Sequence, residues 1–136
     1  MSKKGLQPAS AEQKADRQFV LAAVAETGGD LRYAAGPLKS DREVVMAAVK
    51  QSGGALWHAA AKLKADPEVV LEAVKEDAGA LWYASAKLKT NREFVLQCVA
   101  VNGNSLRYVA TALKDDREVV LTAVAQDRTA LRYASA

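Results

Sequence analysis

The chain repeats itself every 25 residues, and this period constrains its fold more than any other feature. One capping column shows the register without an insertion or deletion: Asp16, Asp41, Asp66, Asn91 and Asp116. Four apolar columns keep the same spacing: Val20, Val45, Val70, Val95 and Val120; Val24, Val49, Val74, Val99 and Val124; Leu31, Leu56, Leu81, Leu106 and Leu131; Leu38, Leu63, Leu88 and Leu113. A fixed period of this length indicates units that bury their apolar faces against one another.

The first part of each unit predicts an amphipathic helix. The carboxylate or amide of the capping column can accept hydrogen bonds from the free N–H groups of a first helical turn. Pro67 follows Asp66 at the first helical position, where proline is favoured. Apolar residues then fall on one stripe, as at Val44, Val45 and Val49. This spacing is typical of a helix with one buried face.

A glycine turn and a second helix complete the predicted unit. Glycines stand at the end of the first helix, where a residue with positive φ often terminates the helix: Gly28, Gly53, Gly79 and Gly103. The fifth unit has Arg128 and Thr129 there, so we expect its turn to differ. Leu81, Ala84 and Leu88 then follow helical spacing over about nine residues, a length that is stable only when packed.

The sequence therefore predicts an all-α fold, an α-solenoid of five tandem two-helix repeats. Residues 1–15 are expected to form a flexible N-terminal tail with a possible short capping helix, since Ser10 and Gln13 fit a capping box. Residues 16–136 form a single repeat domain with units at 16–40, 41–65, 66–90, 91–115 and 116–136. We expect ten helices in five pairs, one extra helix near residues 10–14, and disorder from Met1 to about Pro8. Leu81 and Val74 should be buried.

The repeated motif resembles that of a known family. The unit, with DREVVxxAV, the glycine turn and ALxYAS followed by KLK, resembles an uncharacterised family of short tandem repeats classed as a domain of unknown function. The resemblance covers residues 16–136. The family has no assigned activity, so it implies tandem helical repeats and supplies no catalytic residue.

Two residues are candidates for reactive groups. His58, the single histidine, stands in a column otherwise filled by tyrosine, and Cys98 stands in a column of alanines. Neither has a nucleophile, base and orienting group around it in the pattern, and no phosphate-binding glycine motif or metal-ligand spacing occurs. We expect a non-enzymatic protein with no cofactor and no metal site.

Two adjacent columns are candidates for binding. The tyrosine column could form a ladder, although packing between repeats is the favoured interpretation. The column before it contains residue types enriched at interface hot spots: Arg32, Trp57, Trp82, Arg107 and Arg132. These side chains should be partly exposed, and they either bind a partner or cover neighbouring apolar surface. The other candidate surfaces are the Glu72/Gln97 face and the C-terminal end.

Charge and composition narrow the class of partner. The net charge is +3, and outside residues 1–15 the chain has 16 basic and 15 acidic residues. A repeat domain so close to neutral charge is unfavourable for binding nucleic acid. We expect the lysines near the end of each unit to pair with the acidic caps that follow. We expect an intracellular scaffold or accessory subunit that binds protein, in the cytosol or an organelle matrix and not membrane-spanning. The alternatives are a single-stranded nucleic-acid reader and end-to-end self-association.

Overall fold

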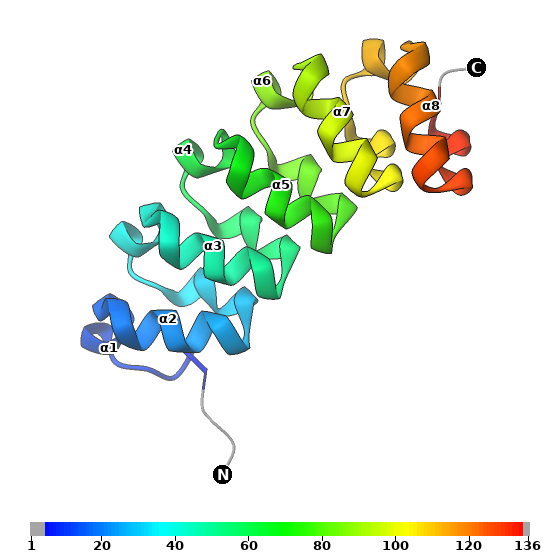
Figure 1. Cartoon of the computed structure of the whole chain (residues 1–136). Coiled ribbons are helices and arrows are strands. Elements are labelled where there is room, and N and C mark those ends of the chain that lie inside the picture. Colours follow the sequence, from blue (N-terminus) through cyan, green and yellow to red (C-terminus); the bar gives the residue numbers. More distant parts are fainter. Residues whose placement is uncertain (1–4, 135–136) are drawn as a thin grey trace.

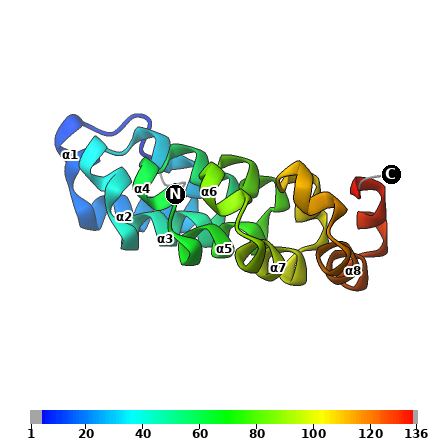
Figure 2. The same cartoon turned by 90° about the horizontal axis from the view of Figure 1, so that it is seen from above.

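The computed structural model describes residues 5–134. Five units stack into an elongated rod, and the axes of the long helices turn step by step along it (Figure 1). Seen from above, the first unit in blue and the last in red lie at opposite ends (Figure 2). Residues 5–134 contain helical segments and no strand, so the predicted all-α solenoid of tandem repeats is confirmed.

Every unit begins with a ten-residue α-helix, followed by a six-residue 3-10 helix. The long helices are α2 (Arg17–Glu26), α3 (Arg42–Gln51), α5 (Pro67–Glu76), α7 (Arg92–Val101) and α8 (Arg117–Gln126). The 3-10 helices are η1 (Gly28–Tyr33), η3 (Gly53–His58), η4 (Ala78–Tyr83), η5 (Gly103–Tyr108) and η7 (Arg128–Tyr133). A short last segment closes the first four units: η2 (Gly36–Ser40), α4 (Ala61–Lys64), α6 (Ala86–Lys89) and η6 (Thr111–Asp115).

The prediction of one continuous second helix was wrong, because each of the first four units divides this part into two segments. Ala84, at the break between η4 and α6, is extended with ψ 159°. The extended backbone lets the next amide reach the preceding unit: Ser85 N–H donates to the Lys64 carbonyl at 3.0 Å, and Ala60 N–H to the Lys39 carbonyl at 2.9 Å. A continuous helix would have used these N–H groups internally. The units are thus joined by backbone hydrogen bonds. Instead of the expected pair of helices, each of the first four units contains three helical segments.

The glycines also serve a purpose different from the predicted one. None of the glycines in the described part of the chain has a positive φ, and the long helices end at extended residues such as Ser52. A Cβ at Gly28 or Gly53 would overlap the carbonyl oxygen of Ala48 or Ala73 in the next unit. Glycine is required here because two backbones approach each other closely.

The fifth turn follows the same geometry, contrary to the expectation that it would differ. η7 is a 3-10 helix like the others, although Arg128 stands at the glycine position. Within the described residues no further unit stacks on Arg128, so its side chain meets no neighbouring carbonyl. The substitution is therefore consistent with a glycine column that serves stacking.

One continuous core runs through the rod. The leucines of the 3-10 helices are completely buried in the first four units: Leu31, Leu56, Leu81 and Leu106. Val74 is also completely buried, so the core prediction for Leu81 and Val74 is confirmed. Leu131, in the same column, is 61% exposed because no unit follows it in the described chain.

The N-terminal segment covers the first unit. α1 (Ala11–Ala15) begins with a complete capping box formed by Ser10 and Gln13. Leu6 is fully buried, and its N–H donates to Asp30 Oδ2 at 2.9 Å. The prediction of disorder up to about Pro8 was therefore wrong from residue 5 onward, because the side chain of Leu6 joins the core. The remainder of that prediction, residues 1–4, lies outside the described residues.

Arginines, and not lysines, pair with the acidic caps. Arg17 Nε lies 2.7 Å from Asp41 and its Nη2 lies 3.1 Å from Glu43, both in the next unit. Arg42 and Arg92 repeat this arrangement with the acidic pairs of the units that follow them. The prediction of a lysine–acid seam was wrong, because the arginines that begin α2, α3 and α7 form the ion pairs with the caps of the next units.

Candidate binding surface

The five residues of the Trp/Arg column lie at equivalent places on successive 3-10 helices, and all are exposed: Arg32, Trp57, Trp82, Arg107 and Arg132. A 3-10 helix has three residues per turn, so consecutive side chains point about 120° apart. In η3, Leu56 points into the core and Trp57 therefore points to solvent. Trp57 is 57% exposed and Trp82 is 63% exposed. Two large aromatic side chains thus stand on one face of the rod.

The tyrosine column packs between units. Tyr83 is half-buried, and its ring centroid lies 5.1 Å from that of Trp57 in the preceding unit, with the planes tilted by 56°. The guanidinium of Arg107 lies 5.8 Å from the centre of the Tyr133 ring in the following unit. At these two junctions the tyrosine contacts the Trp/Arg column of its neighbour, which supports a packing function for the tyrosines.

Lysines at the ends of the short helices cover the tryptophans. Lys64 Nζ lies 5.2 Å from the Trp57 ring centre, and Lys89 Nζ lies 5.3 Å from that of Trp82. Lys89 Nζ also donates to the Trp82 carbonyl at 3.0 Å. These cation–π contacts hold the indole rings in place. They also leave positive charge at the surface, since the described residues contain no ion pair that involves Lys64 or Lys89.

The positive charge continues along the whole face. The pKa of His58 is lowered by partial burial and by the charges of Arg32, Lys39 and Lys64, which repel a proton on the imidazole. We call the following set the aromatic–basic stripe: Arg32, Lys39, Trp57, Lys64, Trp82, Lys89, Arg107, Lys114 and Arg132. A face that is cationic and aromatic at once suits binding of an acidic partner.

Sequence reasoning missed the lysines of the stripe as companions of the tryptophans. A signal was present, because Lys64 follows Trp57 by seven residues and Lys89 follows Trp82 by the same interval. The break between the two short segments turns this interval into a contact, and a continuous helix would have placed these residues two turns apart. The contact therefore depended on a break that the spacing of apolar residues does not reveal.

The candidate reactive groups are placed among packing residues. Cys98 is fully buried, and desolvation raises the pKa of its thiol to about 12. His58 is half-buried among cationic side chains. Across residues 5–134, no group of three or more His, Cys, Asp or Glu side chains is arranged to hold a metal ion.

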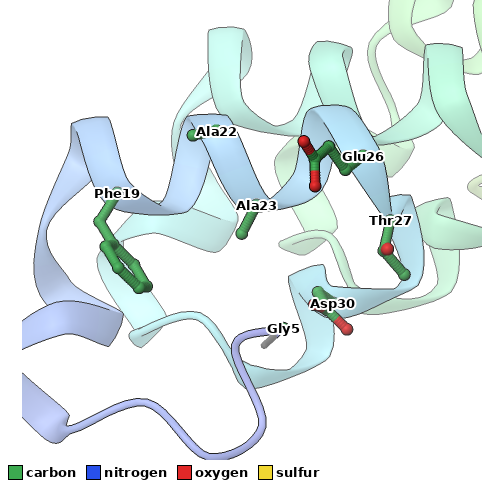
Figure 3. Close-up of a pocket in the computed structure, with 7 residues that line it drawn as sticks. All are labelled: Gly5, Phe19, Ala22, Ala23, Glu26, Thr27 and Asp30. Atoms are coloured by element: carbon green, nitrogen blue, oxygen red, sulfur yellow. The ribbon is translucent and has the colours of Figure 1, made fainter. Parts of the chain in front are cut away.

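Among the hollows of the surface, two concern the candidate site and the N-terminal end. The first, of about 290 Å³, lies at the N-terminal end of the rod; Phe19 stands at one end of it, and Thr27 and Asp30 at the other (Figure 3). The second is a groove of about 540 Å³ between the third and fourth units. We call this groove the Trp82 cleft; its lining residues are Gly54, Asp77, Gly79, Trp82, Tyr83, Arg107 and Tyr108.

Comparison with protein families identifies the repeat. A model described as a domain of unknown function, DUF4116, matches residues 16–64, 66–114 and 91–136. The chain belongs to the DUF4116 family. Each match spans two adjacent 25-residue units, so a DUF4116 domain corresponds to a stacked pair of repeats, and the resemblance seen in the motif is confirmed. No curated protein and no solved structure matched the chain.

The description of the DUF4116 family supplies no activity, so the function of this member has to be argued from its surface. None of the helices among the described residues is long and apolar enough to cross a membrane. The surface features that remain to be explained are the aromatic–basic stripe and the Trp82 cleft.

Proposed function

We propose that this DUF4116 protein is a non-catalytic interaction module that binds a protein partner through the aromatic–basic stripe. It would serve as a scaffold or as an accessory or linker subunit of a larger assembly. The observation that carries the proposal is the exposure of Trp57 and Trp82, each more than half exposed, in one column of the stack. Tryptophan and arginine are the side chains that contribute most to binding when a partner removes them from water.

The placement of the possible reactive groups supports a non-catalytic protein. A thiol with a pKa of about 12 holds little thiolate at neutral pH, and Cys98 has no access to solvent. His58 belongs to the packing column between units. We therefore propose neither a catalytic residue nor a cofactor. We also propose an intracellular location, where a single buried thiol stays reduced.

A single-stranded nucleic acid is a second candidate, because the stripe alternates cations with aromatic rings. Proteins that bind single strands use this combination, with bases stacked on the rings and phosphates near the cations. Against it, Trp57 already has Lys64 and Tyr83 in contact with its ring. A base would have to displace one of these contacts, so we place protein binding first.

The proposal is tested by comparing which cellular proteins two variants of the chain still bind. The chain is immobilised and exposed to an extract of the cells that produce it, with nuclease added to remove nucleic acid. Proteins that bind the natural chain should be lost from the Trp57→Ala/Trp82→Ala variant. The matched control is Val101→Ala/Leu121→Ala, which removes two exposed apolar side chains from the long helices.

The helical content of both variants, measured by circular dichroism, should equal that of the natural chain. If the tryptophan variant keeps its partners and the control loses them, the long helices form the contact surface and the proposal is wrong. Loss of all binding after nuclease treatment would favour the nucleic-acid alternative.

A further inference from the structure

The third and fourth units lack the ion pair that joins other neighbours. At three junctions an arginine at the start of the long helix bonds to the acidic cap of the next unit. The third unit has Pro67 at the arginine position, and the fourth has Asn91 at the position of the acidic cap. Both partners of the pair are thus replaced at this single junction.

The close backbone contact is also missing at this junction. Ala78 occupies the position at which Gly28, Gly53 and Gly103 allow the next long helix to approach. A Cβ at any of these glycines would overlap the facing carbonyl oxygen, so the Cβ of Ala78 holds α7 farther from α5. In agreement, α5 and α7 pack less closely than any other pair of adjacent long helices.

A side-chain hydrogen bond that joins the first two units and the last two units is also lacking here. Gln51 and Gln126 accept hydrogen bonds from the N–H groups of Gly28 and Gly103 at 2.5 Å. The equivalent of these glutamines in the fourth unit is Val101, which has no acceptor. The junction is instead held by Asn102, whose Nδ2 donates to the Val74 carbonyl at 3.1 Å.

The wider spacing opens the Trp82 cleft. At the preceding junction the Trp57 and Tyr83 rings are in contact, and no gap separates them. Trp82 and Tyr108 are the corresponding pair; no ring contact between them occurs within the described residues, and both line the cleft. A second hollow of about 320 Å³ adjoins them and is lined by Lys89, Arg107 and Lys114 as well.

The charges around the two hollows favour an anionic ligand. Lys89, Arg107 and Lys114 line the hollows, and all three lie outside the ion pairs of the described chain. The acidic residue of the lining is Asp77, one of whose carboxylate oxygens already accepts the Gly79 N–H at 2.8 Å. The aromatic side chains of Trp82 and Tyr108 and the cationic side chains therefore lie together around these hollows.

We propose that the Trp82 cleft is the specificity site of the stripe and binds an acidic protein segment that inserts one aromatic side chain between Trp82 and Tyr108. Carboxylates on both sides of the inserted ring pair with Arg107, Lys89 and Lys114. The inserted ring fills the space between Trp82 and Tyr108. At the preceding junction no such ring is needed, because Trp57 and Tyr83 contact each other directly. This inference rests on the proposed protein-binding function and assigns the chemistry of the partner.

One open cleft favours a peptide over a nucleic acid. A single strand places a base at regular intervals, so a reader of bases needs an open position at successive units. The Trp57–Tyr83 and Arg107–Tyr133 pairs are closed by direct contact. A segment with one large aromatic side chain requires one opening, and the Trp82 cleft provides one.

A defined peptide tests the chemistry of the site. The probe is a short fluorescein-labelled peptide with one phenylalanine flanked on both sides by glutamates, titrated with the full chain and followed by fluorescence anisotropy. We expect saturable binding that weakens at least tenfold when the phenylalanine is replaced by alanine or when the glutamates are replaced by glutamines. Labelled oligothymidylate is titrated in parallel.

Two single variants locate the binding. Trp82→Ala should weaken peptide binding at least tenfold, whereas Leu121→Ala, which removes an exposed apolar side chain outside the stripe, should leave it within twofold. The natural chain has two tryptophans, so Trp57→Ala leaves Trp82 as the sole source of indole emission. In that variant the peptide should shift or quench the emission, and in Trp82→Ala the emission of Trp57 should not respond.

The inference is overturned if oligothymidylate binds more tightly than the peptide, if Trp82→Ala and Leu121→Ala weaken binding equally, or if no peptide binding is detected. The last result leaves the proposed function intact when cellular partners are still lost from the double tryptophan variant. Failure of both experiments removes the stripe as a binding surface altogether.

Discussion

At the scale of single residues, the need for glycine is set by the neighbouring unit. Gly28 lies against the Ala48 carbonyl of the next unit, whereas a Cβ at Gly29 would meet nothing within 4 Å. Gly28→Ala should therefore lower the free energy of unfolding by about 1–3 kcal/mol, as overpacking does. Gly29→Ala should be neutral or raise it by about 0.4–1 kcal/mol, because alanine restricts the unfolded chain. Urea unfolding measures both, and equal losses would show that the backbone conformation demands glycine at both positions.

The leucine column offers a second comparison at this scale. Leu81 is completely buried, while Leu131 in the same column is 61% exposed. Leu81→Ala should cost about 2–5 kcal/mol of unfolding free energy because it leaves a cavity. Leu131→Ala should change that free energy by no more than about 0.5 kcal/mol, as most surface substitutions do. Thermal and urea unfolding of the two variants would reveal a wrong register if their losses were alike.

At the scale of elements, the long helices are joined by ion pairs that depend on pH. The hydrogen bond from Arg17 lowers the pKa of Asp41, and the hydrogen bond from Arg92 lowers that of Asp116. Desolvation by partial burial is the largest single influence on Asp66 and would raise its pKa, but the hydrogen bond and charge of Arg42 together with the N–H groups of Val69 and Glu68 outweigh it, and the pKa is lowered. A carboxylate with a lowered pKa in the folded state stabilises the fold above its ordinary value, and this contribution is lost as the pH falls.

We therefore expect the stability contributed by these ion pairs to be constant above about pH 5 and to fall progressively below the ordinary aspartate pKa of 3.8. Arg42→Gln removes one of these pairs and should make the fall shallower. Exposed pairs contribute only about 0–1 kcal/mol each, so the effect requires urea unfolding at several pH values. An unchanged pH profile in this variant would mean that the pair between α3 and α5 contributes nothing to stability.

At the scale of the whole molecule, the junction between the third and fourth units divides the rod. Tandem repeats unfold according to the strength of each interface, and this interface lacks both the ion pair and the glycine approach. In native-state hydrogen exchange, residues 16–90 and 91–134 should therefore open as two cooperative groups with different free energies. Exchange of all long helices with one common free energy would show that the junction is as strong as the others.

A variant can restore the missing features without changing Trp82 or Tyr108. Pro67→Arg, Asn91→Asp and Ala78→Gly together reproduce the residues found at the other junctions. This triple variant should merge the two exchange groups into one. It should also weaken binding of the acidic peptide at least tenfold, because Tyr108 would approach Trp82 and close the cleft. If the exchange groups merge but peptide binding is unchanged, the weak junction is not what creates the peptide site.

Much of the fold could be predicted from the sequence, because the signals for it repeat. The capping column, the valine stripe and the leucine column occur in five copies, so each local prediction was checked by the others. The exposure of Trp57 and Trp82 followed from their place beside Leu56 and Leu81 in the pattern. The division of the second helix could not be predicted in this way, since apolar spacing at Leu81, Ala84 and Leu88 fits either structure.

The sequence by itself determined the number of units, their register, their buried columns and the residues of the candidate stripe, because these depend on periods within one chain segment. The tertiary structure decided what depends on two units at once. It showed that glycine at 28 and 53 serves the neighbouring backbone, that arginines and not lysines meet the acidic caps, and that Ala78 opens a cleft beside Trp82. The physical reason is that stacking distance is set by contacts between residues about 25 positions apart, which no local pattern records.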